Sequence, residues 1–235
     1  AAVALLDRNV LFTSHEALNT TATGALFRNS TPFHGAHVVV STALGNYGHA
    51  SMSWARFSYA GLESFPRYGS RMPALRYWAA IRNSPTPLAP LVGMSFSDCK
   101  GGGIDVMSGA WGLQLEGNVF VSNRGPAVES DGEAHSMVLR NNLAIGTMQR
   151  LPHDPSIYEP TAAFNLGALP LEMIGNVAGG SADIGFTFRP AICGSEDKRF
   201  GASSADANEA YGGLVGFFIL RTCTEAGGGP KACEA

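Results

Sequence analysis

Four short stretches of the chain share one pattern. They read MSFSDC at 94–99, LQLEGNV at 113–119, MVLRNNL at 137–143 and LEMIGNV at 171–177. Each has an apolar residue, any residue, a second apolar residue, two further residues, and then Asn or Cys. Alternation over a few positions that ends in a turn residue is typical of a short, half-buried strand.

The pattern returns along the chain at unequal intervals. The stretches begin at Met94, Leu113, Met137 and Leu171, and the segment 52–57 fits the same frame. Ile104, Val128 and Phe186 fall where a second strand would close each coil. One coil cannot bury its own apolar face, so such repeats stack on one another. We therefore predict an all-β fold, a right-handed parallel β-helix with long loop excursions.

The recurring Asn suits this fold for two reasons. Asn adopts a left-handed turn conformation at little strain, and stacked Asn amides can hydrogen-bond from coil to coil. The rival fold is an antiparallel sandwich, which needs hairpin turns between paired strands. Apart from Asp131-Gly132, no Asn-Gly, Asp-Gly or Gly-Gly pair lies between two alternating runs, and this favours the β-helix.

The composition agrees with strands and turns. The 235 residues include 29 Gly and 13 Pro, above the average of about 7 % and 5 %, and only 15 % are charged against about 25 %. We expect one β-helix domain over 1–235, an internal piece of a larger multidomain protein. Loops at 61–91 and 147–163 and an irregular C-terminal region at 189–235 interrupt the repeat.

Charge and hydropathy exclude two kinds of partner. The 16 basic and 19 acidic residues give a net charge of −3 with no block of either sign, so we expect no nucleic-acid partner. The longest apolar run, Leu214–Leu220, is far shorter than the roughly 20 residues that cross a bilayer. We expect no membrane-spanning segment in this piece.

The cysteines indicate an oxidising compartment. No CxxC pair occurs, and no histidine stands at zinc-finger spacing from a cysteine, so we expect no structural metal site. Cys193, Cys223 and Cys233 are the disulfide candidates, and their pairing stays open. The sequons at Asn19 and Asn29 are candidate glycosylation sites and agree with secretion.

Longer stretches resemble a known family. They are VALLDRNVLF at 3–12, GAHVVV at 35–40, SMSWARFSYAG at 51–61, WGLQLEGNVF at 111–120, VLRNNLAIGT at 138–147, NVAGGSADIGFTF at 176–188 and NEAYGGLVGFFI at 208–219. In the same order, they resemble the right-handed β-helix region of fibrocystin and fibrocystin-like receptors. Cell-migration-inducing and transmembrane hyaluronidases share this region. The resemblance implies a place on the cell surface or on a cilium.

The histidines that the hyaluronidase resemblance requires are missing. Arg67-Tyr68 survives from an Arg-Tyr-Pro-x-His-x-His stretch, but the segment 72–78 contains no histidine. The coil at 103–109 has no His-Gly, and Gly125-Pro126 stands in place of Gly-His. Without these groups neither a metal ligand set nor a suitable general acid or base remains, so we expect a protein that is not an enzyme.

Two sets of residues are candidates for binding. Glu129, Asp131 and Glu133 alternate, so on a strand they face one side as a carboxylate cluster, which could serve glycosidic cleavage or bind calcium. A solvated segment around Asp131-Gly132 explains the same residues. Calcium is the one cofactor that this pattern suggests.

The second set interleaves arginines with aromatic residues, and its members are Arg67, Tyr68, Arg71, Arg76, Tyr77 and Trp78. Such residues anchor protein interfaces, and they also hold sugar rings and acidic glycans. We favour the interface.

These observations predict a non-catalytic, extracellular structural and interaction module of a large fibrocystin-like surface protein. Its expected partners are neighbouring domains of the same chain and other surface proteins. The alternatives are a hyaluronidase-like or pectinase-like enzyme that acts on polysaccharides, and a glycan-binding module.

Overall fold

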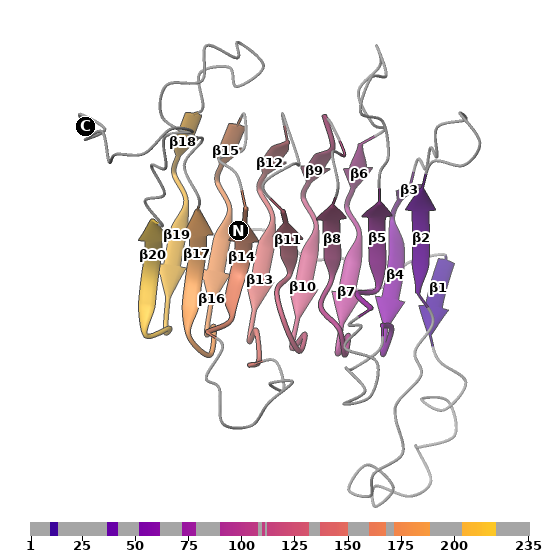
Figure 1. The fold of residues 1–235 in the computed structure, drawn as a ribbon, viewed down its shortest axis with the longest axis horizontal. Helices are drawn as coiled ribbons and strands as arrows, with labels where there is room; N and C mark the ends of the chain where they lie inside the picture. Colours follow the sequence, from indigo (N-terminus) through magenta and orange to yellow (C-terminus); the bar gives the residue numbers. More distant parts are fainter. Residues whose placement is uncertain are drawn as a thin grey trace, which may run out of the picture.

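The computed structural model describes the strands and corners of the predicted solenoid. The described residues are 10–13, 37–41, 52–61, 72–78, 90–107, 110, 112–131, 137–149, 160–167, 172–188 and 204–219. They form twenty short strands, and no helix occurs among them. Figure 1 shows the strands stacked in rows along the long axis, from β1 at one end to β20 at the other.

The strands form three sheets. The first contains β1 (Val10–Thr13), β4 (Ala55–Ser58), β7 (Ser95–Ser97), β10 (Val119–Val121), β13 (Leu143–Ile145), β16 (Val177–Gly179) and β19 (Glu209–Tyr211). The second contains β2 (Val38–Ser41), β5 (Leu75–Trp78), β8 (Ile104–Met107), β11 (Val128–Ser130), β14 (Ala162–Leu166), β17 (Ile184–Phe188) and β20 (Val215–Ile219). The third contains β3 (Met52–Ser53), β6 (Leu91–Val92), β9 (Gln114–Glu116), β12 (Val138–Arg140), β15 (Glu172–Ile174) and β18 (Ser204–Asp206).

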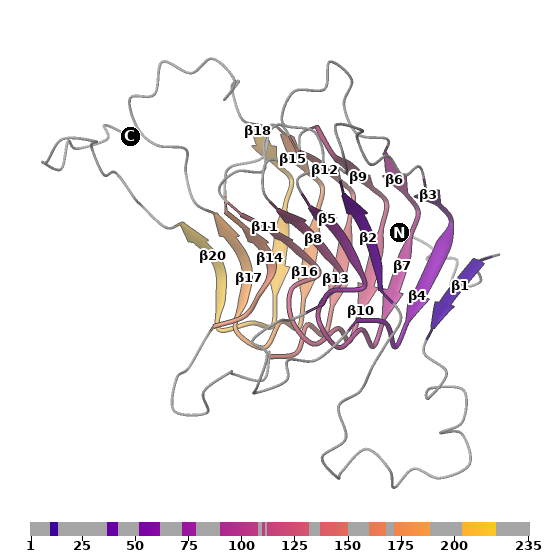
Figure 2. The same ribbon diagram turned by 45° about the vertical axis from the view of Figure 1, so that its right-hand side comes forward.

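Each complete coil of the chain gives one strand to each sheet, and the last coil gives β19 and β20 to the first two. Neighbours within a sheet are three strands apart in sequence order, and the pairs are parallel, as in β7–β10 and β8–β11. Figure 2 shows the coils wrapping around one interior. The predicted parallel β-helix is confirmed. Ile104, Val128 and Phe186 lie on the second sheet in one register row, as the sequence indicated.

The register corrects the frame of the sequence repeat. The sequence repeat predicts that 94–99 is equivalent to 113–119, but Leu91 is the residue that pairs with Leu115. Phe96 lies on the first sheet and pairs with Phe120. The alternation is the same on each sheet, so it cannot tell which sheet a strand joins. In the correct frame Leu91, Leu115 and Leu139 form one register row and are evenly spaced along the chain.

The corners between sheets turn on single residues in the left-handed conformation. Between the third and first sheets these residues are Trp54, Gly93, Gly117, Asn141, Gly175 and Ala207, with φ from 51° to 65°. The recurring Asn of the sequence pattern directly follows this position, so the expectation that it occupies the left-handed turn is wrong for Asn118, Asn142 and Asn176.

These asparagines instead form a buried ladder, and the predicted stacking of their amides is confirmed. The Nδ2 of Asn118 donates to Oδ1 of Asn142, Asn142 donates to Asn176, and Asn176 donates to Asn208, each at 2.9 Å. Each Oδ1 also accepts the backbone N–H of the preceding residue in the ladder, at 3.0 to 3.1 Å. The ladder therefore satisfies backbone and side-chain groups that would otherwise be buried without partners.

Two rows of phenylalanine rings line the interior, one on the first sheet and one on the second, in different coils. On the first sheet Phe12, Phe57, Phe96 and Phe120 stack with centroids 4.5 to 4.9 Å apart. Ala144, Ala178 and Ala210 continue this row.

On the second sheet Phe164, Phe186 and Phe217 stack at 4.8 and 4.9 Å, in the same coils as the alanines. The coils up to β11 therefore carry their phenylalanine on the first sheet, and the coils from β14 onward carry it on the second sheet. Each coil has one phenylalanine ring in this pair of rows. The side-chain volume that the two rows contribute to the core is therefore nearly the same in every coil.

Candidate functional site

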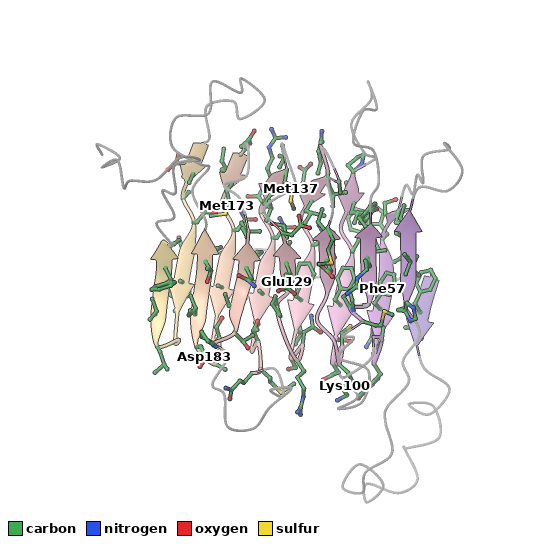
Figure 3. The ribbon with its side chains drawn as sticks, viewed as in Figure 1. Phe57, Lys100, Glu129, Met137, Met173 and Asp183 are labelled. Carbon is green, nitrogen blue, oxygen red and sulfur yellow. The ribbon has the colours of Figure 1, made fainter. Side chains whose placement is uncertain are left out.

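One row of polar side chains runs along the outer face of the second sheet. The register aligns Arg76, Asp105, Glu129, Asn165 and Thr187 on successive strands. Strand alternation explains this row, because flanking residues such as Leu75, Tyr77, Phe164 and Leu166 are buried in the core. Figure 3 shows Glu129 near the middle of the sheet. The row brings together Arg76, from the set of arginines and aromatic residues, and Glu129, from the predicted carboxylate cluster.

Arg76 and Asp105 form an ion pair between adjacent coils. The Nε and Nη2 of Arg76 lie 3.0 and 2.9 Å from Oδ2 of Asp105, and the side chains are 12 % and 7 % exposed. A guanidinium that pairs with a nearly buried carboxylate stays bound to that carboxylate within the sheet. Arg76 thus has a partner inside the molecule, which the sequence did not predict.

Glu129 is also engaged within the row. Its Oε1 accepts a hydrogen bond of 2.9 Å from Nδ2 of Asn165 on the next coil. Asp131 lies one residue after β11, on the same side of the strand, and both carboxylates are half-buried. Glu133 lies outside the described residues. Within the described ranges, no group of three or more His, Cys, Asp or Glu side chains could hold a metal ion.

Tyr77 does not belong to the outer surface. It alternates with Arg76 on β5, and its ring is fully buried in the core. Burial raises the pKa of its phenol far above the usual range, and its hydroxyl has no hydrogen-bond partner among the residues that the structure describes. The sequence set interleaved arginine with aromatics, and the pleat of the strand separates them onto opposite faces.

The other members of that set are not placed. Trp78 lies on β5, and its side chain is outside the described part of the structure. Also outside it are Arg67, Tyr68, Arg71, the sequons Asn19 and Asn29, and the disulfide candidates Cys193, Cys223 and Cys233.

Cys99 is a buried thiol. Its Sγ lies 3.9 Å from the carbonyl oxygen of Phe57 and 3.7 Å from that of Ser97. Desolvation raises the pKa of this thiol to about 12, so it stays protonated and unreactive at neutral pH. It forms no disulfide.

Two aromatic residues flank β4 on the outer surface, and the sequence named neither as a binding candidate. The repeat frame put Trp54 at its second apolar position, and the structure corrects this because Trp54 is an exposed turn residue. Trp54 and Tyr59 both have positive φ, of 57° and 52°, and are 52 % and 37 % exposed. The Trp54 ring covers Gly93 of the next coil so closely that a Cβ there would lie 2.8 Å from it. Lys100 places its Nζ 6.0 Å from the centre of the Tyr59 ring. Exposed Trp and Tyr are enriched in protein interfaces.

Two further carboxylates are engaged by neighbouring coils. Asp183 is buried, and its Oδ2 accepts a 2.8 Å hydrogen bond from the backbone N–H of Thr161. Glu172 forms a bidentate pair with Arg140 at 2.5 and 2.7 Å on the outer face of the third sheet. The hydrogen bond from Arg140 lowers the pKa of Glu172. These pairs join residues 22 and 32 positions apart, a spacing that no local pattern reveals.

Comparison with protein-family models finds no matching family, and searches of curated proteins and of solved structures find no match. No helix that is long and apolar enough to cross a membrane occurs among the residues that the structure describes.

Proposed function

We propose that the chain is a non-catalytic structural and interaction module of a large fibrocystin-like protein on the cell surface, including the surface of a cilium. The sequence resemblance supports the family and the location. The stacked coils support a role as a rigid spacer, since the six intervals of about 4.8 Å between seven strands span about 29 Å. The Asn ladder, which binds coil to coil through buried amides, stiffens this stack.

The observation that carries the non-catalytic role is the engagement of the outward carboxylates. A glycosidase needs one carboxyl group that gives a proton and a second that acts as base or nucleophile. In the polar row Asp105 is nearly buried against Arg76, and Glu129 accepts from Asn165. These bonds hold the carboxylates to neighbouring coils and support a structural use of the row.

The interaction role draws on Trp54 and Tyr59, which lie at the two ends of β4, and on Lys100 beside the Tyr59 ring. Both aromatic residues sit at strained turn positions, each costing about 1–2 kcal/mol for a side chain other than glycine. Rigid, amphipathic rings presented at the surface are typical anchors for a protein partner. The partners we propose are neighbouring domains of the same chain and other surface proteins.

An extracellular setting adds two modifications to the proposal. Asn19 and Asn29 carry glycans, and one disulfide forms within the set Cys193, Cys223 and Cys233. Both rest on the sequence motifs.

Purified chain incubated with hyaluronan and with pectin, with and without calcium, tests the proposal. We expect no shortening of either polymer on a gel. Shortening that disappears in Glu129→Gln and persists in the matched control Glu172→Gln would establish a polysaccharide-cleaving enzyme instead. Retention of the chain on immobilised glycan without cleavage would establish a glycan-binding module.

A further inference from the structure

The outer face of the first sheet is apolar in its middle strands. The outward side chains of β10, β13 and β16 form two register rows, and we call their apolar members the apolar block: Val119, Val121, Leu143, Ile145 and Val177. Ile145 is 46 % exposed, and the others except Val119 are half-buried. The second sheet instead carries its polar row on the outside, and the third carries the Arg140–Glu172 pair. An exposed apolar patch on one face marks a surface that binds another protein.

Opposite charges flank the apolar block at equal distances. Arg56 on β4 and Glu209 on β19 lie in the same register row as Val119. Arg56 is two strands before β10, and Glu209 is two strands after β13. At about 4.8 Å per strand, the point midway between β10 and β13 is therefore about 12 Å from each. Figure 1 shows β4 and β19 near opposite ends of the sheet, with β10 and β13 between them.

The corner residues at these two ends differ in size in a complementary way. Trp54 and Tyr59, at the corners before and after β4, are 52 % and 37 % exposed. The register places Ala207 and Gly212 at the equivalent corners of β19, and both are exposed. Large residues at one end of the face therefore correspond to small residues at the other end.

We infer that two copies of this chain pack their first sheets face to face. The two-fold axis runs parallel to the strands, midway between β10 and β13. This rotation reverses the order of the strands and keeps the register rows, so it places Arg56 of each copy opposite Glu209 of the other. It also brings Trp54 opposite Ala207. A symmetric dimer of this kind needs one self-complementary patch, and the inference deepens the proposed interaction role, on which it rests, by naming the partner.

The size of the face predicts a weak dimer. Six strands at about 4.8 Å give a length of about 29 Å, and the six residues from Trp54 to Tyr59 at about 3.3 Å give a width of about 20 Å. Two such faces bury about 1,200 Å² in total, at the lower end of the range for specific interfaces. The dimer should therefore form reversibly. Packed sheets lie about 10 Å apart, a distance that an arginine and a glutamate can span between them.

Sedimentation velocity of the full chain tests the dimer. The chain is studied from about 1 to about 100 μM, the range in which a weak interface forms and dissociates. We expect a monomer at the lowest concentration and twice the mass at the highest. A monomer throughout the range, or a dimer that is already complete at the lowest concentration and does not dissociate, would overturn the inference.

Charge reversal tests the orientation of the two copies. Arg56→Glu puts carboxylates opposite each other at both ends of the interface, and Glu209→Arg does the same with guanidinium groups. Each variant should raise the dimer Kd at least about 10-fold. The double variant restores opposite charges and should return the Kd to within about 3-fold of the original. Single variants that dimerise normally, or a double variant as weak as either single one, contradict the two-fold arrangement.

A substitution in the apolar block tests the surface itself. Ile145 lies beside the axis, opposite Val121 of the second copy, so Ile145→Lys should abolish the dimer. Because nearly half of Ile145 is exposed, this variant should keep the circular dichroism spectrum and Tm of the original chain. The matched control Asp206→Lys changes an exposed charge on the third sheet and should leave the Kd unchanged. A dimer that survives Ile145→Lys, or one that Asp206→Lys weakens equally, refutes this interface.

The mass measurements are separate from the glycan assay. A chain that dimerises and also cleaves hyaluronan refutes the proposed function and leaves the dimer intact. A chain that stays monomeric and cleaves neither polymer refutes the dimer and leaves the proposed function intact.

Discussion

Asn142 and Asn176 are 34 residues apart in the chain, and the Nδ2 of the first donates to Oδ1 of the second at 2.9 Å inside the solenoid. The same Nδ2 donates to the carbonyl oxygen of Leu115, also at 2.9 Å. One amide thus joins three coils. Its two donor and two acceptor positions are all used, which is the condition under which a buried polar group stabilises a fold.

Removing the centre of this ladder should be costly. Asn142→Ala takes the acceptor away from the backbone N–H and Nδ2 of Asn118, and it leaves the Leu115 carbonyl without its donor. With about 1–3 kcal/mol for each buried group left unpaired, we expect a loss of at least about 3 kcal/mol in the free energy of unfolding, measured by urea denaturation. Asn208→Ala, at the end of the ladder, is the matched control and should cost less. Equal losses would contradict the ladder model.

The exchange of rings between the two sheets predicts a compensating pair of substitutions. Ala144→Phe alone adds a second ring to a coil that already holds Phe164, so we expect overpacking and a loss of about 1–3 kcal/mol. Combining it with Phe164→Val recreates the arrangement of the coil before, where Phe120 and Val128 share the interior.

The double variant should therefore regain most of the stability that Ala144→Phe loses, as measured by thermal denaturation. A double variant that is less stable than either single variant would show that the two rows do not share the interior volume. Phe120→Ala, with no compensating ring, should cost about 3–5 kcal/mol.

The buried thiol of Cys99 predicts a pH dependence of stability. Its pKa rises from 9.0 to about 12 on folding, so the unfolded chain releases the proton first as the pH rises. The stabilising contribution is complete below pH 9 and is lost between pH 9 and 12, with a slope approaching about 1.4 kcal/mol per pH unit. Urea denaturation across this range should show a steeper fall for the unmodified chain than for Cys99→Ala. Rapid labelling of Cys99 by a thiol reagent in the native state at pH 8 would refute its burial.

The two ion pairs should differ in their effect on stability. Asp105→Ala leaves Arg76 without the carboxylate that holds it in a nearly buried position, and we expect a loss of about 3–5 kcal/mol. Glu172→Ala breaks a pair that faces solvent, and little change is expected. Denaturation of both variants under the same conditions measures the difference, and a larger loss in Glu172→Ala would show that burial does not set the strength of these pairs.

Much of the fold can be predicted from the sequence because its signals are local. Alternating residues such as Leu113 and Leu115 indicate a strand within three positions, and the return of Asn after each such strand indicates a stacked repeat. The second strand of each coil, at Ile104, Val128 and Phe186, was also found in this way. These features depend on neighbours in the chain, which a pattern can read.

Tertiary structure alone decided which residues meet. The true frame of Leu91, the inward orientation of Tyr77 beside the outward Arg76, and the pairing of Arg76 with Asp105 all depend on register between coils. In the third sheet the chain from Leu115 to its partner Leu139 is shorter than the chain from Leu139 to its partner Met173, so no constant spacing reveals the register. Local alternation has a period of two and is the same in every strand, so only the packing of whole coils selects the partner of each side chain.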